Sequence, residues 1–205
     1  MGTTALVAST GTSASVPYPT DIAVGDLLLL GCQGRNNSMN WTATGFDTLV
    51  APAGPSGLRF ELLSRWATGG ESGTLTVAST TGINGWSCSL TAMRGGIGSG
   101  DPLAAAIVTQ TGTSRGMVAP AVPTVPEGAL VTRWFASSDD NSHGTPSEGI
   151  LAFGGTGYHT VTGVDHGSSM SYAVQTAAGT RGTASMQQNL NFADPSVAVS
   201  VVLRP

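Results

Sequence analysis

The stretch Leu58-Arg59-Phe60-Glu61-Leu62-Leu63-Ser64-Arg65-Trp66 decides the fold class. Its apolar side chains alternate with polar ones, because Leu58, Phe60 and Leu62 share one face. Arg59, Glu61 and Arg65 occupy the other face. A period of two residues is typical of a β-strand with one buried and one solvated face. The pattern predicts such a strand, with Glu61 ion-paired to its neighbouring arginines on the wet face.

Similar runs continue along the chain in both directions from this strand. Glycine, with 29 residues, and proline, with 11, gather between the runs at 51–57, 69–73 and 95–100. These residues punctuate turns and break helices, and no helical period is visible. The sequence therefore predicts an all-β protein with almost no helix. Its expected strands include 26–32, 58–66, 84–93, 128–136 and 196–203.

An internal repeat suggests how these strands are organised. Thr10–Ser13 recurs as Thr111–Ser114, and the closing strands of both halves end in an arginine, Arg94 or Arg204. The period is too long for a solenoid or a propeller blade. Two similar halves of about four strands predict a two-sheet, jelly-roll-like sandwich. We expect one β-sandwich domain over 1–205, with halves of approximately 1–94 and 101–205 and a crossover at 95–100.

Charge is scarce, which excludes several kinds of partner. Charged residues make up 10% of the chain, against about 25% in an average protein. The net charge is −4, lysine is absent, and the eight arginines are scattered. Without a basic patch we expect no nucleic-acid partner, and without a long apolar run we expect no membrane partner. The start lacks the features of a signal peptide, so synthesis in a host cytoplasm is expected.

The two cysteines, Cys32 and Cys88, each lie in an apolar run. Disulfides are rare in proteins made in a reducing compartment. The expectation is two buried, reduced thiols, with a Cys32–Cys88 disulfide as the alternative. Two cysteines supply too few ligands for a metal site, and no cofactor is expected.

Five segments resemble small structural proteins of tailed bacteriophages of actinobacterial hosts, described as minor tail or virion-associated proteins. The resemblance covers nearly the whole chain, although these families usually carry Gly-Trp where this chain has Gly45-Phe46. It implies a virion structural protein with no inherited catalytic residue. The matching segments are Gly25–Leu29, Gly45–Val50, Arg65–Ala67, Glu71–Thr76 and Val202–Pro205.

The residues give little support for an enzyme. There are three histidines but no Gly-x-Ser-x-Gly nucleophile elbow. Most of the 12 acidic residues adjoin glycine, proline or strand starts, where they cap turns, and none forms a privileged pair. We expect a protein that is not an enzyme.

Two loops and one tyrosine are the candidate contact residues. Trp41 follows a polar loop with Asn36, Asn37 and Asn40. An exposed Trp41 would stack on a sugar or anchor an interface, and the alternative is a ring folded back over the sandwich end. The other three tryptophans are expected in the core.

The loop containing Asp139, Asp140 and His143 is the second candidate. It is interpreted as a solvated contact loop in preference to a calcium site, because its acids lack the spacing of a calcium hand. Tyr158, after a glycine-rich run, is a third candidate contact.

Two functions from different classes follow. The first is a virion structural protein that acts through assembly, tail-associated in slight preference to capsid decoration. Its partners would be other virion proteins and further copies of itself. The alternative is a carbohydrate- or receptor-binding module that contacts a glycan on the host surface.

Overall fold

A computed structural model describes residues 2–3, 7–81, 85–95, 98–104, 108–138, 142–154, 166–188 and 194–205. These residues form strands and turns and contain no helix, so the all-β prediction is confirmed. All five predicted strands are present, as β4, β7, β9, β13 and β18. The strands are β1 Gly2–Thr3, β2 Val7–Ser9, β3 Ser13–Pro17, β4 Leu27–Gly34, β5 Trp41–Ala43, β6 Asp47–Ala53, β7 Arg59–Trp66, β8 Thr74–Ser79, β9 Trp86–Met93, β10 Val108–Thr113, β11 Gly116–Ala119, β12 Val122–Val125, β13 Leu130–Ser137, β14 Ile150–Gly154, β15 Gly167–Val174, β16 Gly179–Arg181, β17 Ala184–Gln187 and β18 Pro195–Leu203.

Two large antiparallel sheets form the centre of the molecule. The N-terminal large sheet has the order β1-β9-β4-β7-β6, and β2 also pairs with β9. The C-terminal large sheet has the order β10-β18-β13-β15-β14. In each sheet the closing strand of its half, β9 or β18, lies between the first strand and the long central strand. The two strand orders therefore correspond position by position.

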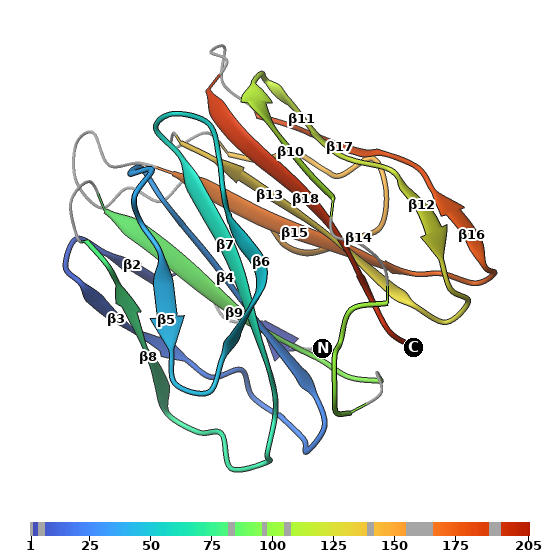
Figure 1. The fold of residues 1–205 in the computed structure, drawn as a ribbon, viewed down its shortest axis with the longest axis horizontal. Helices are drawn as coiled ribbons and strands as arrows, with labels where there is room; N and C mark the ends of the chain where they lie inside the picture. Colours follow the sequence, from blue (N-terminus) through green and yellow to red (C-terminus); the bar gives the residue numbers. More distant parts are fainter. Residues whose placement is uncertain are drawn as a thin grey trace.

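The large sheets face each other, and smaller sheets cover their outer faces (Figure 1). One hydrophobic cluster joins Leu29 and Leu62 of the first large sheet to Trp134 and Val199 of the second. The sheet β3-β8-β5 covers the N-terminal large sheet, and the pairs β11–β17 and β12–β16 cover the C-terminal one. The expected two-sheet sandwich is thus too simple, because the sheets stack in four layers.

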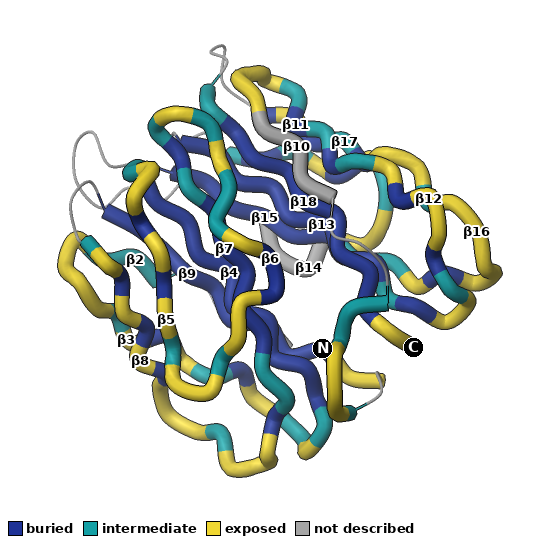
Figure 2. Tube along the Cα trace, viewed as in Figure 1, coloured by how far each residue is buried: buried dark blue, intermediate teal, exposed yellow. Residues whose placement is uncertain are grey.

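This stacking explains why the central strands are buried on both faces (Figure 2). In β4, Leu27 and Leu29 point to the opposite large sheet, while Leu28 and Leu30 point to the small sheet. A strand with two buried faces reads as a continuous apolar run. Leu27–Leu30 is that run, so its composition reflects a position in an inner layer.

The predicted wet face of β7 is wrong. Glu61 is only 3% exposed, because β5 of the small sheet lies over that face. Its carboxylate accepts hydrogen bonds from the Trp41 backbone N–H at 2.9 Å and from Thr48 Oγ1 at 3.2 Å. Arg65 pairs instead with Glu71, at 3.0 Å. Burial raises the pKa of Glu61 above its ordinary value.

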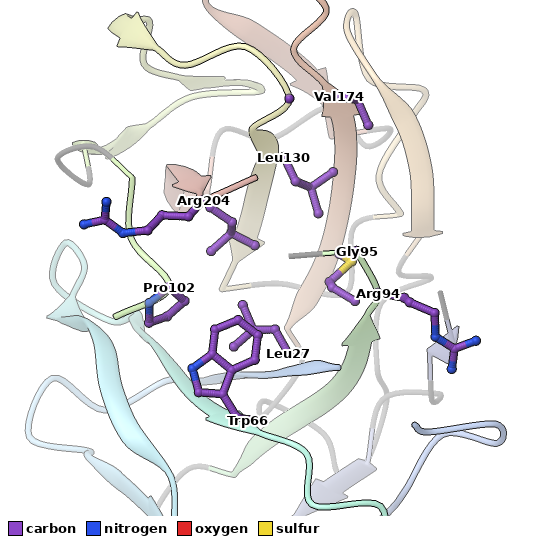
Figure 3. A pocket seen from close by; sticks show the side chains of 11 residues that line it. Leu27, Trp66, Arg94, Gly95, Pro102, Leu130, Val174 and Arg204 are labelled. Carbon is purple, nitrogen blue, oxygen red and sulfur yellow. The ribbon is translucent and has the colours of Figure 1, made fainter. Parts of the chain in front are cut away.

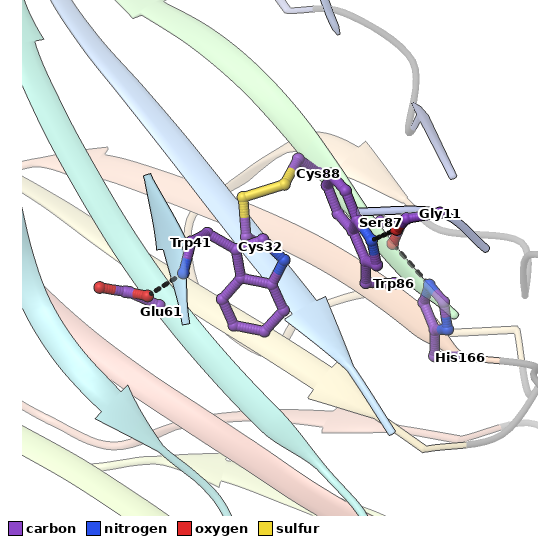
Figure 4. The surroundings of a disulfide bond; sticks show 8 residues. All are labelled: Gly11, Cys32, Trp41, Glu61, Trp86, Ser87, Cys88 and His166. Atoms are coloured by element: carbon purple, nitrogen blue, oxygen red, sulfur yellow. Dashed lines mark hydrogen bonds between the residues drawn. A yellow bond between two sulfur atoms is a disulfide. The ribbon is translucent and has the colours of Figure 1, made fainter. Parts of the chain in front are cut away.

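The expectation of two reduced thiols is also wrong, because Cys32 and Cys88 form a disulfide (Figure 4). The two residues are direct partners on β4 and β9, with Cα atoms 4.2 Å apart. Such a short separation is typical of the non-hydrogen-bonded pairs in an antiparallel ladder, where side chains approach most closely. Strand register, which joins residues 56 apart in the sequence, therefore places the two sulfur atoms together.

A buried arginine divides the outer layer of the C-terminal half. Arg133, on β13, is 2% exposed and donates hydrogen bonds to the carbonyls of Pro120 and Gly182. These carbonyls lie where β11 gives way to β12 and where β16 gives way to β17. Glu148 ion-pairs with both Arg133 and Arg181. The guanidinium group thus occupies the break between the two small ladders.

Candidate functional site

A large hollow lies beside Trp66, at the end of β7. Its volume is about 550 Å³. The hollow is bounded by β6, by β7 and by the crossover segment that includes Gly100 and Pro102. Trp66 Nε1 donates a hydrogen bond to the carbonyl of Gly100 at 2.6 Å, which holds the crossover against the ring. We call this hollow the Trp66 groove.

The Trp66 groove is lined by five polar side chains. They are the exposed carboxylates of Asp47 and Asp101, the hydroxyls of Thr48 and Ser64, and the guanidinium group of Arg65. The guanidinium group is already committed, because it binds Glu71 and lies 5.1 Å from the centre of the Phe46 ring. Asp101 is also partly committed, because it accepts a hydrogen bond from the Leu103 N–H at 2.9 Å and lies 3.9 Å from Arg204 Nη2, so the Asp47 carboxylate is the group best placed for a ligand. An aromatic edge beside carboxylates is suited to sugar hydroxyls and ring carbons.

A smaller apolar hollow of about 90 Å³ adjoins this groove, between the ends of the two large sheets (Figure 3). It is lined by matching positions of the two sheets. Leu27 lies opposite Met93 and Trp66 in its sheet, and Leu130 lies opposite Leu203 and Val174 in the other.

Two arginines stand at the rim of this smaller hollow, and both point away from it (Figure 3). Arg94 binds the Asp26 carboxylate through Nε and Nη2, each at 2.9 Å. Arg204 donates to the carbonyl of Asp101 at 3.0 Å. The hollow therefore offers apolar contact and no anion site.

Two buried histidines bind serines. His143 Nε2 lies 2.9 Å from Ser137 Oγ, and His143 Nδ1 lies 2.7 Å from Ser169 Oγ. Burial lowers the pKa of His143 to about 4, so the ring is neutral at pH 7. His166 Nε2 lies 2.7 Å from Ser87 Oγ and joins the two large sheets. Among the described residues, no cluster of three or more His, Cys, Asp or Glu side chains could hold a metal ion.

The prediction of an exposed Trp41 ring is wrong. Trp41 is 1% exposed and packs with Trp86 in the core between β4 and the small sheet, with ring centres 6.5 Å apart. The folded-back alternative describes the structure. Trp86 and Trp134 lie in the core as expected, whereas Trp66 is only partly buried.

The asparagine loop before Trp41 lies at the surface, and hydrogen bonds hold its three asparagine side chains. Asn36 Oδ1 accepts a hydrogen bond from the Ser38 backbone at 3.0 Å. Asn37 Oδ1 accepts one from the Gly57 backbone at 2.9 Å, and Asn40 Oδ1 accepts one from Arg59 at 3.1 Å. The side-chain oxygens of the loop are therefore already bound, one to the loop's own backbone at Ser38 and two to the neighbouring segment at Gly57 and Arg59.

The second candidate loop is only partly described. Asp139, Asp140 and Tyr158 lie outside the described residues. His143 is 9% exposed and faces Ser137 and Ser169, so its ring is not presented to a partner, contrary to the prediction. The 35–40 segment follows β4, and the segment containing His143 follows β13. Because Leu27 and Leu130 begin these strands beside one hollow, both segments lie at the opposite end of the molecule.

Sequence reasoning missed the Trp66 groove. It assigned Trp66 to the core because the residue continues the apolar face of its strand. The available signal was position, since Trp66 is the last residue of β7 and the glycine-rich crossover packs beside it. Strand ends lie at the rim of a sandwich, where large side chains line hollows.

Comparison with known proteins yields no relative. No family model matches the chain, and neither a curated protein nor a solved structure matches it. Within the described residues, no helix is present that is long and apolar enough to span a membrane.

Proposed function

We propose that the protein is a non-enzymatic structural component of a bacteriophage particle that acts by packing against neighbouring proteins. The observation that carries the proposal is that most of the arginines are paired with acidic side chains within the chain. Among the described residues, at least five of the chain's eight arginines form ion pairs with acidic side chains of the same chain, namely Arg65, Arg94, Arg133, Arg181 and Arg204. Free surface charges oppose association between proteins. A surface with few of them suits a protein whose role is to pack against neighbouring proteins.

The resemblance to phage tail proteins supports the same proposal and slightly favours the tail over the capsid. The test is to separate heads from tails of purified particles and to detect the chain by mass spectrometry. Enrichment with tails supports the tail assignment, and enrichment with heads favours capsid decoration. Absence from both fractions would refute the virion role.

A loop variant tests the contact surface. Asn36, Asn37 and Asn40 are replaced with serine, and the matched control replaces the exposed Thr176, which follows β15 at the opposite end of the molecule, with serine. Reduced incorporation of the loop variant alone would support the asparagine loop as a contact. Equal incorporation of both variants would mean that this loop contacts no neighbour.

We also propose that the chain is one jelly-roll-like domain whose two halves are copies of one ancestral unit. The support is the matching strand order of the large sheets and the shared position of Leu27 and Leu130 relative to their partners. Gly31 and Trp134 occupy the same place counted from these leucines. Superposition of an experimental structure of each half tests the duplication, and unrelated strand paths would refute it.

Carbohydrate binding is the second candidate function, favoured by the Trp66 groove. Its expected ligand is a neutral or cationic saccharide, because Asp47 supplies a carboxylate beside an aromatic edge. Binding to a glycan array should fall for Asp47→Asn and remain for Asn37→Ser, which lies at the opposite end. Loss of host-cell binding with normal particle incorporation would move the assignment to this function. Absence of binding by the unaltered protein would reject it.

A further inference from the structure

The edges of the two large sheets differ in how they are protected. An unpaired edge strand is a template for pairing with another chain, and proteins usually block it with bulges, prolines or charges. The outer edge of the N-terminal large sheet is β6, which contains Pro52 and two register shifts against β7. The corresponding edge of the C-terminal large sheet is β14, which has a register shift between Leu151 and Phe153. Both of these edges carry blocking features.

The opposite edge of the C-terminal large sheet carries none of these features. Strand β10 pairs with β18 over six consecutive residues, Val108–Thr113, without a register shift. Its sequence, Val-Thr-Gln-Thr-Gly-Thr, contains no proline and no charged residue. Within the described part of the chain, β10 pairs with β18 alone, so its other edge has no strand partner.

The remaining edges are less suited to pairing. In the N-terminal large sheet, β1 and β2 cover only two and three residues of the edge beside β9. In the small sheet, β3 ends at Pro17 and β5 has three residues. An incoming strand could form more backbone hydrogen bonds with a regular strand of six residues than with any of these edges. The four strands of the two-stranded sheets, β11, β12, β16 and β17, have four residues or fewer, so β10 is the longest edge strand without a register shift among the described strands.

We propose that β10 pairs antiparallel with β10 of a second copy of the chain. This inference rests on the proposed assembly function and identifies one of its contacts. Antiparallel pairing of a strand with itself is compatible with a two-fold axis, which is the commonest symmetry of homodimers. The strand is uncharged, so two copies meet without like-charge repulsion. The pairing would join two five-stranded sheets into one of ten strands.

The test uses charge at Gln110, in the middle of β10. In the proposed register, which pairs Gln110 with Gln110 of the second copy, Gln110→Lys or Gln110→Glu places like charges opposite each other, whereas a mixture of the two variants places opposite charges there. The matched control is Ala51→Lys, on the exposed part of β6. Sedimentation velocity measures the dimer dissociation constant of each protein, and far-UV circular dichroism confirms that each is folded.

We expect the unaltered chain to dimerise at micromolar concentration and each Gln110 variant to dimerise roughly tenfold more weakly. Mixing the two variants should restore the dimer, and Ala51→Lys should leave it unchanged. An unaltered chain that remains monomeric at about 100 μM, a level at which weak interfaces associate, would overturn the inference. So would Gln110 variants that dimerise as tightly as the unaltered chain, a mixture that fails to restore the dimer, or an equal loss in Ala51→Lys.

Failure of this inference is distinguishable from failure of the proposed function. A monomeric chain that still enters particles would overturn the β10 contact and leave the structural role intact. A β10-dependent dimer that is absent from particles would support the contact and overturn the virion role.

Discussion

Replacement of Gly31 with alanine should destabilise the contact between the two large sheets. Gly31 lies on β4, and the Trp134 ring of the opposite sheet packs directly over it. A Cβ atom at Gly31 would lie 3.0 Å from Cε3 of that ring, 3.2 Å from Cη2 and closer still to Cζ3. Ordinary contacts between carbon atoms are about 3.5–4.0 Å, so the ring must move.

The size of this effect follows from overpacking. Forcing an added methyl group into a filled core costs about 1–3 kcal/mol, because side chains and backbone must shift. Trp134→Ala alone should cost about 3–5 kcal/mol through the cavity that it leaves. The three closest contacts of the new methyl group are all with this ring, so the double variant should be more stable than the sum of the two single costs predicts. Urea unfolding followed by far-UV circular dichroism measures all three variants.

Gly112→Ala is the matched control, since Gly112 also lies inside a strand and a Cβ atom there meets nothing within 4 Å. It should be neutral or stabilise the fold by up to about 1 kcal/mol, as expected for alanine in place of a strand glycine. The reasoning would be refuted if Gly31→Ala were as harmless as Gly112→Ala. Strict additivity of Gly31→Ala and Trp134→Ala would refute it as well.

Three further measurements test the buried polar groups and the disulfide. Arg133→Met should lower the free energy of unfolding in urea, because it removes two part-buried hydrogen bonds from a charged donor, to the carbonyls of Pro120 and Gly182, each worth about 1.5–3 kcal/mol, and an unchanged urea midpoint would contradict this role. The pKa of His143 is about 4 in the folded chain, below its ordinary value of 6.5, so the unfolded chain alone takes up this proton as pH falls from about 6.5 to 4. Stability should fall by up to about 3 kcal/mol across that window in the unaltered chain, and His143→Gln, followed by thermal unfolding, should remove that part of the pH dependence. Replacing Cys32 and Cys88 with alanine should cost about 4 kcal/mol for a loop of this length, and alkylation of the unfolded, unreduced chain should label neither cysteine; labelling of both would show free thiols.

Local patterns identified the strands reliably. The alternation in 58–66 and the valines of 196–203 lie within single strands, so they report the local backbone without knowledge of the partner strands. The same alternation was misleading about exposure. Glu61 looked solvated because its own strand is half polar, yet β5 covers that face and leaves the carboxylate buried.

The candidate site was less predictable than the fold. Trp41 stood in a polar loop by sequence, but its position opposite Ser79 on β8 turns the ring into the core. Trp66 stood in an apolar strand face, but its position at the strand end leaves it beside a groove. In both cases exposure depends on which element covers the residue, and that element lies elsewhere in the chain.

The sequence by itself determined the all-β class, the places of the main strands and the scarcity of charge, since side-chain period, turn residues and composition are local properties. The four layers, the Cys32–Cys88 disulfide, the burial of Trp41 and the place of β10 at the edge of its sheet among the described strands are visible only in the tertiary structure. Each of these depends on strand register or on sheet packing between residues far apart in the chain. A side chain's own neighbours in the sequence set its strand, but the opposing sheet sets whether it meets water.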